Sequence, residues 1–113
     1  MKHIKAVIRP DKLGDVRDAL EKTGAYKGVM ITDIVGQGNQ KGIAQVWRGE
    51  KFQLDLIPKL SLDLVVDDKD VRTVVNAILS SAPIGEYGDG KIFIYPVEEV
   101  IRIRTGEEGE GAL

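Results

Sequence analysis

The sequence has no cysteine and only one histidine, His3. The absence of cysteine excludes disulfides, iron–sulfur clusters, thiol catalysis and zinc sites built on thiolates. A single histidine cannot form a histidine metal site alone, and its place near the start of an expected strand argues against a Ser-His-Asp triad. Aromatic residues make up 5% of the chain. The lack of paired aromatics on a central strand argues against an RNA-binding sheet.

Long hydrophobic runs and an excess of one charge are also missing. No apolar run approaches the roughly 20 residues that a membrane helix needs, and the N-terminal apolar stretch is too short for a signal peptide. We therefore expect a cytoplasmic protein. The 16 basic and 18 acidic side chains give a net charge of -2, without the basic excess that nucleic-acid and membrane-surface proteins usually need. The length of 113 residues suits one domain.

Apolar residues recur with strand and helix periods in an order that defines the fold class. The expected strands are residues 2–9, 29–35, 60–66 and 91–97, and the expected helices lie between Asp11 and Gly24 and over residues 71–79. We expect Asp11, Asp67 and Asp68 to cap the helices. The order predicts a ferredoxin-like βαββαβ fold of the α+β class, with both helices on one face of an antiparallel sheet. Apolar residues on the other face, such as Val7 and Val65, indicate that another subunit covers it.

Residues 37–57 form a connection far longer than the flanking strands need. The apolar residues Trp47 and Phe52 within it are unusual for a disordered spacer, so we interpret the segment as an extended arm that orders on a partner. Residues 100–104 are expected to be extended. The polar tail after residue 106 is expected to be mobile.

Two glycine-rich turns are candidates for binding an anion. Residues 36–42 resemble a dinucleotide fingerprint, but the third glycine comes late and no helix pattern follows. Residues 85–91 contain G-x-x-x-x-G-K, but Ile92 stands where a P-loop needs Ser or Thr, and the turn runs from helix to strand. Each turn can place backbone N–H groups and a lysine, Lys41 or Lys91, near an anion. Taken alone, each is explained more simply as a hinge or an ordinary Asp-Gly turn.

Several cations strengthen the case for an anionic ligand. Arg102 and Arg104 lie two apart, so on an extended segment both face one way and form a phosphate or carboxylate clamp, unless they are a solvated edge. Lys59 precedes the third strand. We expect the two turns, Lys59, Lys91 and both arginines to converge around the sheet ends. Asp63 is the one candidate acid or base, and nothing nearby in sequence orients it, so we expect no catalysis.

The motifs, taken together, resemble those of the PII family of nitrogen regulatory signal-transduction proteins. They are I-R-P at residues 8–10, Q-K-G at 40–42, R-G at 48–49, L-I-P-K at 56–59, G-D-G-K-I-F at 88–93, P-V-E-E at 96–99 and I-R-I-R-T-G at 101–106. The similarity runs from residue 1 to about 108. It implies a homotrimer in which ATP and ADP compete for clefts between subunits, with residues 37–57 as the family's T-loop.

The resemblance also implies roles for individual residues. By position, the nucleotide-binding residues would be Ile8, Met30, Gly36, Gly38, Asn39, Gln40, Val65, Gly88, Asp89, Gly90, Lys91, Arg102 and Arg104. Gln40 would help to hold Mg²⁺ on ATP, and 2-oxoglutarate would bind Gln40, Lys41, Gly42 and Lys59. Trp47, Arg48 and Phe52 would contact a partner, either an ammonium channel or a nitrogen-metabolism enzyme, with the membrane reached only through such a channel. 2-Oxoglutarate and ADP would favour different T-loop arrangements.

At several positions the sequence departs from the family pattern. Phe52 stands where the uridylylated members carry tyrosine, so we expect no such modification. Asn39 replaces a frequent arginine and Met30 a frequent threonine. Ile84 and Glu86 replace polar or basic residues, and Glu86 adds negative charge near a polyphosphate. These changes leave an alternative open: a PII-like trimeric interaction module with altered or lost nucleotide and 2-oxoglutarate sensing.

Overall fold

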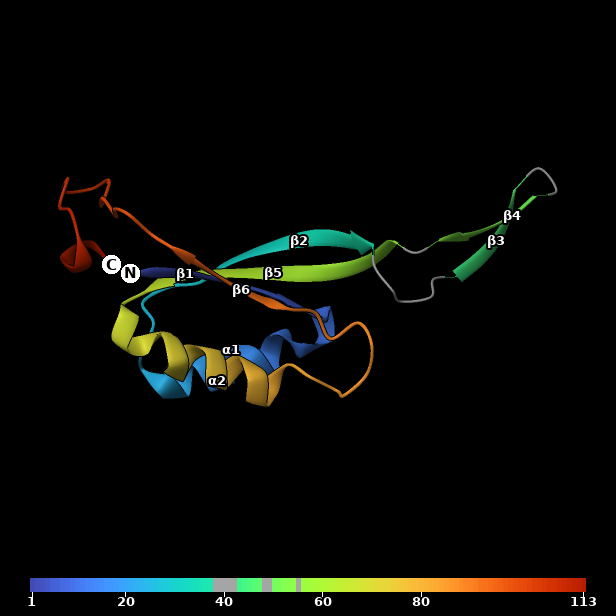
Figure 1. Ribbon diagram of the computed structural model, residues 1–113, viewed down its shortest axis with the longest axis horizontal. Coiled ribbons are helices and arrows are strands. Elements are labelled where there is room, and N and C mark those ends of the chain that lie inside the picture. Colours follow the sequence, from blue (N-terminus) through green and yellow to red (C-terminus); the bar gives the residue numbers. More distant parts are fainter. Residues whose placement is uncertain (38–42, 48–49, 55) are drawn as a thin grey trace.

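A computed structural model describes residues 1–37, 43–47, 50–54 and 56–113 (Figure 1). The strands are β1 (Lys2–Ile8), β2 (Met30–Gln37), β3 (Ile43–Trp47), β4 (Glu50–Leu54), β5 (Leu56–Val66) and β6 (Ile92–Pro96), and the helices are α1 (Leu13–Thr23) and α2 (Val71–Ser81). Short 3-10 turns span Pro10–Lys12, Asp68–Asp70 and Glu110–Ala112. No helix within these described ranges has the length and apolar character to cross a bilayer.

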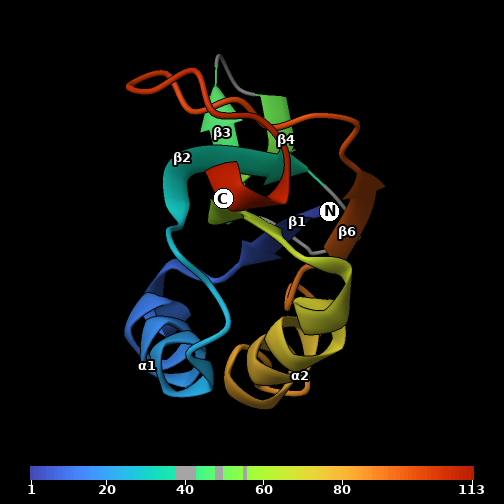
Figure 2. The ribbon, with the colours of Figure 1, turned by 90° about the vertical axis from the view of Figure 1, so that its left-hand side faces the viewer.

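The main sheet has four strands in the order β2-β5-β1-β6, and every pair is antiparallel. Both helices pack side by side on one face of this sheet (Figures 1 and 2). This arrangement confirms the predicted ferredoxin-like α+β fold. The strand order follows from the connections, because each helix carries the chain from one strand to a strand that is not its direct neighbour.

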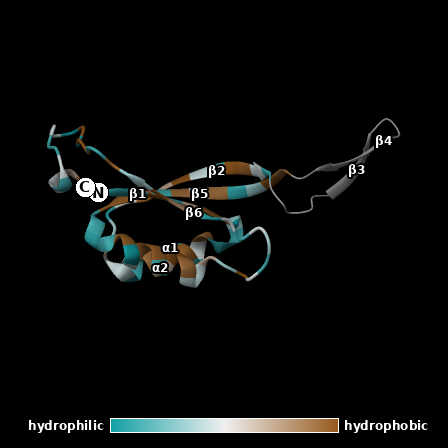
Figure 3. Cartoon of the chain, in the orientation of Figure 1, coloured by the Kyte–Doolittle hydropathy of each residue, from teal (hydrophilic) through white to brown (hydrophobic). Residues whose placement is uncertain are grey.

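The core lies between the sheet and the helices, where Figure 3 shows the apolar residues of both layers gathered. Alternate residues of β1, such as Ile4 and Ile8, and of β5, such as Leu62, are almost fully buried. They meet Leu20 of α1 and Ile78 of α2, which are buried as completely. The period of two in the strands therefore assigns the core face, as predicted.

The helix starts differ from the prediction. Asp11 lies inside the 3-10 turn after Arg9, and α1 begins at Leu13 with no side-chain cap. Asp67 precedes the second 3-10 turn and makes no capping hydrogen bond either. Asp68 instead accepts from the Met1 ammonium group at 2.9 Å. At the other end of α1, Gly24 takes a left-handed conformation with φ of 63°, as predicted.

The connection between β2 and β5 contains more structure than predicted. β2 and β5 stay paired as far as Gln37 opposite Leu56, so β5 begins well before residue 60. Beyond them β3 and β4 form a two-stranded antiparallel sheet of their own, with Ile43 opposite Leu54. This hairpin extends past the end of the main sheet (Figure 1). The arm therefore has internal pairing in the single chain.

The prediction of an extended segment over residues 100–104 is wrong. The chain folds back there, because the N–H of Gly106 donates to the carbonyl of Arg102 at 2.7 Å and the N–H of Arg102 donates to the carbonyl of Glu107 at 2.8 Å. Gly106 permits the reversal, since its φ of 71° is unfavourable for other residues.

The tail that follows, predicted to be mobile, is held against this turn. The 3-10 turn Glu110–Ala112 buries Ala112. The N–H of Gly109 donates to the carbonyl of Val100 at 3.0 Å. These contacts close the C-terminal segment into a compact hook, which we define as residues 99–113.

Candidate functional site

A cavity of about 550 Å³ lies at the end of the sheet from which the hairpin extends. Its walls come from the end of β2 at Gly36 and Gln37, from Lys59 in β5, and from residues 86–91 in the loop between α2 and β6. Strand register brings these segments together, because Ile34 pairs with Lys59 and the N–H of Val7 donates to the carbonyl of Lys91 at 2.9 Å. The size is typical of a small-molecule site.

The structure therefore brings Gly36, at the start of the first glycine-rich turn, together with the second turn. Gly36, Lys59, Gly88, Gly90 and Lys91 all line the cavity. Asp89 lines it as well. Their predicted roles in binding a ligand stay predictions, but the predicted meeting of the β2 end with the second turn is observed.

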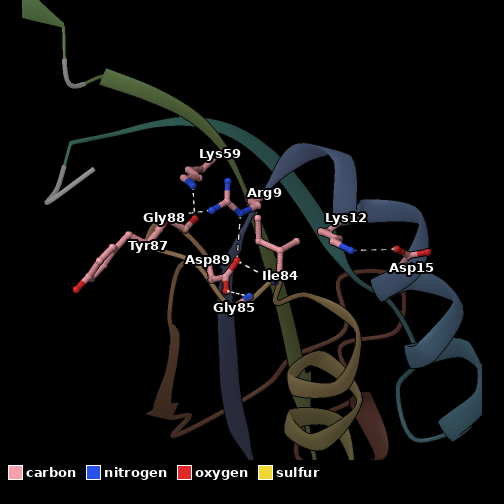
Figure 4. A network of polar contacts seen from close by, with 9 residues as sticks. All are labelled: Arg9, Lys12, Asp15, Lys59, Ile84, Gly85, Tyr87, Gly88 and Asp89. Atoms are coloured by element: carbon pink, nitrogen blue, oxygen red, sulfur yellow. Dashed lines mark hydrogen bonds and ion pairs between the residues drawn. The ribbon is translucent and has the colours of Figure 1, made fainter. Parts of the chain in front are cut away.

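Asp89 organises the second turn through its side chain (Figure 4). Its carboxylate accepts from the N–H of Ile84 at 3.1 Å and from the N–H of Gly85 at 2.9 Å. The hydrogen bond from Ile84 is the main cause that lowers the pKa of Asp89, and bonds from Arg9 and Gly85 act in the same direction. The turn therefore closes around an ionised carboxylate.

Two cations hold the carbonyl groups of the same turn. Arg9 donates from Nε to Asp89 Oδ1 at 3.1 Å and from Nη2 to the carbonyl of Tyr87 at 2.7 Å. The Lys59 ammonium donates to the carbonyl of Gly88. Lys59 is only 8% exposed, and its pKa is lowered by burial and then by the charge of Arg9. The neighbouring positive charges favour an anionic ligand.

Arg9 was not among the predicted site residues. It directly follows β1, and its partner Asp89 lies 80 residues further along the chain. The strand pattern and Pro10 explain Arg9 as a surface residue, so only the fold shows its contact with the turn. Val7 was missed for a related reason, since it lines the cavity while Ile8 faces the core.

Three predicted nucleotide-binding residues lie away from the cavity in the single chain. Ile8 is buried in the core beneath the helices, while its neighbour Val7 lines the cavity. Val65 pairs with His3 near the far end of β5. Met30 is exposed at the start of the edge strand β2.

Other predicted residues belong to the arm. Gly38, Asn39, Gln40, Lys41, Gly42 and Arg48 lie outside the described residues. Trp47 ends β3, and Phe52 lies in the middle of β4, paired with Gln45. The predicted magnesium, 2-oxoglutarate and partner contacts that fall on these positions stay predictions.

The predicted clamp of two arginines does not form in the single chain. Arg102 donates from Nη1 to Glu107 Oε2 at 2.9 Å, and from Nη2 to the carbonyls of Gly111 at 3.2 Å and Leu113 at 3.4 Å. Arg104 is exposed on the turn of the hook. Figure 1 places the hook at the opposite end of the sheet from the loop between α2 and β6, whose residues 86–91 line the cavity. The predicted convergence of both arginines with Lys59 and Lys91 is therefore wrong within one chain.

Asp63 has partners that the sequence did not reveal. Its Oδ1 lies 2.7 Å from Nε2 of His3, and its Oδ2 accepts from the Ser61 hydroxyl at 3.0 Å. The serine thus donates to the carboxylate directly and not to the imidazole. A nucleophile–base relay needs the hydroxyl on the imidazole, so this cluster on the helix-free face does not have a triad's geometry.

The lowered pKa of Asp89 predicts an acid-sensitive turn. A carboxylate with a lowered folded-state pKa stabilises the fold above its unfolded pKa, and this stability is lost as pH falls through the folded value. Asp89→Asn should therefore lower the urea midpoint at neutral pH and flatten its decline below about pH 4. Asp18→Asn, on the exposed side of α1, is the control. Equal pH dependence in the two variants would contradict the prediction.

The chain was compared with protein-family models and with known proteins. A family model described as "Nitrogen regulatory protein P-II" matches residues 1–107, which include the cavity walls and the start of the hook. The chain belongs to the P-II family. It is 50% identical to "Nitrogen regulatory protein P-II 2" of Methanothermobacter thermautotrophicus, covering all of this chain and 97% of that protein. It is 47% identical to a P-II protein of Pasteurella multocida and 46% identical to "Nitrogen regulatory protein P-II 1" of Escherichia coli K12, with full coverage of both chains in each case. Membership in the P-II family confirms the resemblance read from the motifs.

Proposed function

We propose that this protein is a regulatory sensor of nitrogen metabolism that binds ATP or ADP in the cavity between β2, β5 and the loop after α2. The observation that carries the proposal is the meeting of Gly36 with residues 88–91 beside two lysines, Lys59 and Lys91. Glycine lets a backbone approach phosphate closely, and lysine neutralises its charge. The regulatory names of the relatives support a role without catalysis.

We further propose that the cavity takes a nucleotide with its metal and a second, carboxylate ligand. Lys59 is a buried ammonium group on the cavity wall, suited to one carboxylate of 2-oxoglutarate. Gln40 would help to hold Mg²⁺ on ATP, and Lys41 and Gly42 would complete the 2-oxoglutarate site. Bound Mg²⁺ would neutralise phosphate charge and offer coordination positions to the carboxylate ligand.

The proposed working form is a homotrimer with the nucleotide in clefts between subunits. Phe93 and Tyr95 stand opposite Lys5 and His3 in the sheet, on the face away from the helices, and both are exposed. Ile103 on the hook is fully exposed, at 101%. Apolar residues exposed together support an interface. A neighbouring subunit would also let Arg104 reach a cavity that it cannot reach in its own chain.

The proposed output is the arm that carries β3 and β4. It projects beyond the end of the sheet next to the cavity (Figure 1). Ligands that bind at the foot of the arm can bias its arrangement by their differential affinity for the alternatives. The partner would be an ammonium channel contacted through Trp47, Arg48 and Phe52, or an enzyme of nitrogen metabolism, in the cytoplasm.

Calorimetric titration with ATP and Mg²⁺, alone and with 2-oxoglutarate, tests the proposal. We expect ATP to bind and 2-oxoglutarate to tighten it, with the reciprocal effect of ATP on 2-oxoglutarate. Lys91→Gln should weaken ATP roughly tenfold, as expected for one lost charge-assisted contact. Lys22→Gln, on the exposed side of α1, is the control and should leave the affinity for ATP unchanged.

A second function is favoured by one observation, the acidic side chain of Glu86 on the cavity wall. Its charge opposes a polyphosphate, which fits a P-II-like interaction module with altered or lost sensing. Absence of any ATP or ADP binding would overturn the sensor and favour this module. Binding without an effect of 2-oxoglutarate would leave an energy sensor only.

A further inference from the structure

The loop between α2 and β6 is fastened to the end of β1 by one side chain, Arg9 (Figure 4). Arg9 is 18% exposed at its side chain and uses two different nitrogen atoms: Nε binds Asp89 Oδ1 at 3.1 Å and Nη2 binds the carbonyl of Tyr87 at 2.7 Å. A planar guanidinium fixes the angle between such contacts, which a lysine ammonium cannot do. Both contacts therefore fix the turn relative to the sheet.

The hydrogen bond between Arg9 and Asp89 also fixes the start of the turn. The same carboxylate holds the N–H groups of Ile84 and Gly85. One ion pair thus links β1 to the first and last parts of the loop that lines the cavity. Lys12, which directly precedes α1, forms its ion pair with Asp15 of that helix at 3.7 Å and not with the loop.

The held carbonyls set the direction of the N–H groups that follow them. In a trans peptide the N–H points opposite to the carbonyl. Arg9 holds the Tyr87 carbonyl and Lys59 holds the Gly88 carbonyl. The N–H of Gly88 therefore points away from Arg9, and the N–H of Asp89 points away from Lys59. In the described part of the chain, no hydrogen bond uses either N–H group. Successive unpaired N–H groups of this kind form an anion-binding concavity.

We propose that Arg9 is a positioning residue of the cavity: it fixes the turn so that the N–H groups of Gly88 and Asp89 are presented to an anionic ligand. The inference rests on the proposed function for the identity of that ligand, a nucleotide phosphate. The role of Arg9 in holding the turn is independent of any ligand.

Arg9→Lys separates positioning from charge, since it keeps the cation and loses the fork. In the ligand-free protein, we expect hydrogen exchange of the Ile84 and Gly85 amides, followed by NMR, to rise roughly tenfold. The dissociation constant of ATP with Mg²⁺ should rise by a similar factor. Arg17→Lys, exposed on α1, is the matched control and should change neither quantity. Asp89→Asn should raise exchange at the same two amides, and the double variant should exceed neither single change by much.

The two measurements distinguish the failure of each proposal. Unchanged exchange in Arg9→Lys overturns the positioning role. Faster exchange with unchanged ATP affinity also overturns it, because the turn would then be held without consequence for the ligand. If wild-type protein binds no ATP, the proposed function fails, and the exchange measurement still decides whether Arg9 holds the turn.

Discussion

Gly90→Ala should lower the free energy of unfolding by about 4 kcal/mol, which combines backbone strain with overpacking. Gly90 has a φ of 89°, and a Cβ atom at this position would lie 1.8 Å from the carbonyl oxygen of Val7. That oxygen belongs to the backbone of β1, and the N–H of the same residue is bonded to Lys91. The strand cannot move away without losing this pairing, so β6 would have to separate from β1 where the cavity wall begins.

Gly85→Ala is a matched control for the Gly90 variant. Gly85 has nearly the same φ, 86°, but a Cβ atom there meets nothing within 4 Å. It should therefore cost only the strain, about 1 kcal/mol. Urea unfolding of both variants measures the difference. Equal losses would show that β1 and β6 relax around the added methyl group.

Lys59→Met should abolish the tightening of ATP binding by 2-oxoglutarate, a loss of about 100-fold in the affinity for the dicarboxylate. Methionine preserves the apolar stem of this buried side chain and removes the ammonium group. The carboxylate would then meet a neutral wall. Because Lys59 also binds the Gly88 carbonyl, ATP alone should bind several-fold more weakly.

Calorimetry with and without 2-oxoglutarate separates these two effects, and Lys22→Met on the exposed side of α1 controls for the loss of one charge. Retention of the 2-oxoglutarate effect in Lys59→Met would show that another residue holds the carboxylate. Unchanged binding of ATP alone would show that the contact with Gly88 does not support the nucleotide site.

The fold could be predicted from the sequence because its signals are local and repeated. Ile4, Ile8 and Leu62 follow a period of two, and the helices bury one stripe each. The same period of two places Ile8 in the core and its neighbour Val7 on the cavity wall. Neighbouring residues of a strand face opposite ways, so a shift of one position along β1 separates the cavity from the core.

The polar contacts of the site could not be predicted, because they join distant residues through the fold. Nothing in the local sequence pairs Arg9 with Asp89 or His3 with Asp63. The prediction that Arg102 and Arg104 form a clamp was wrong within one chain for another reason. Spacing of two predicts one face only on an extended backbone, and at Arg102 the Glu107 carboxylate and the left-handed Gly106 favour a reversal instead.

Tyr87 combines a fixed backbone with a free ring. Its carbonyl is held by Arg9, while its side chain is 87% exposed on the rim of the cavity. A ligand that enters the cavity would remove water from this ring without displacing its backbone. Tyrosine emission at this position therefore offers an optical reporter of occupancy that needs no attached dye, and Tyr87→Phe supplies the blank.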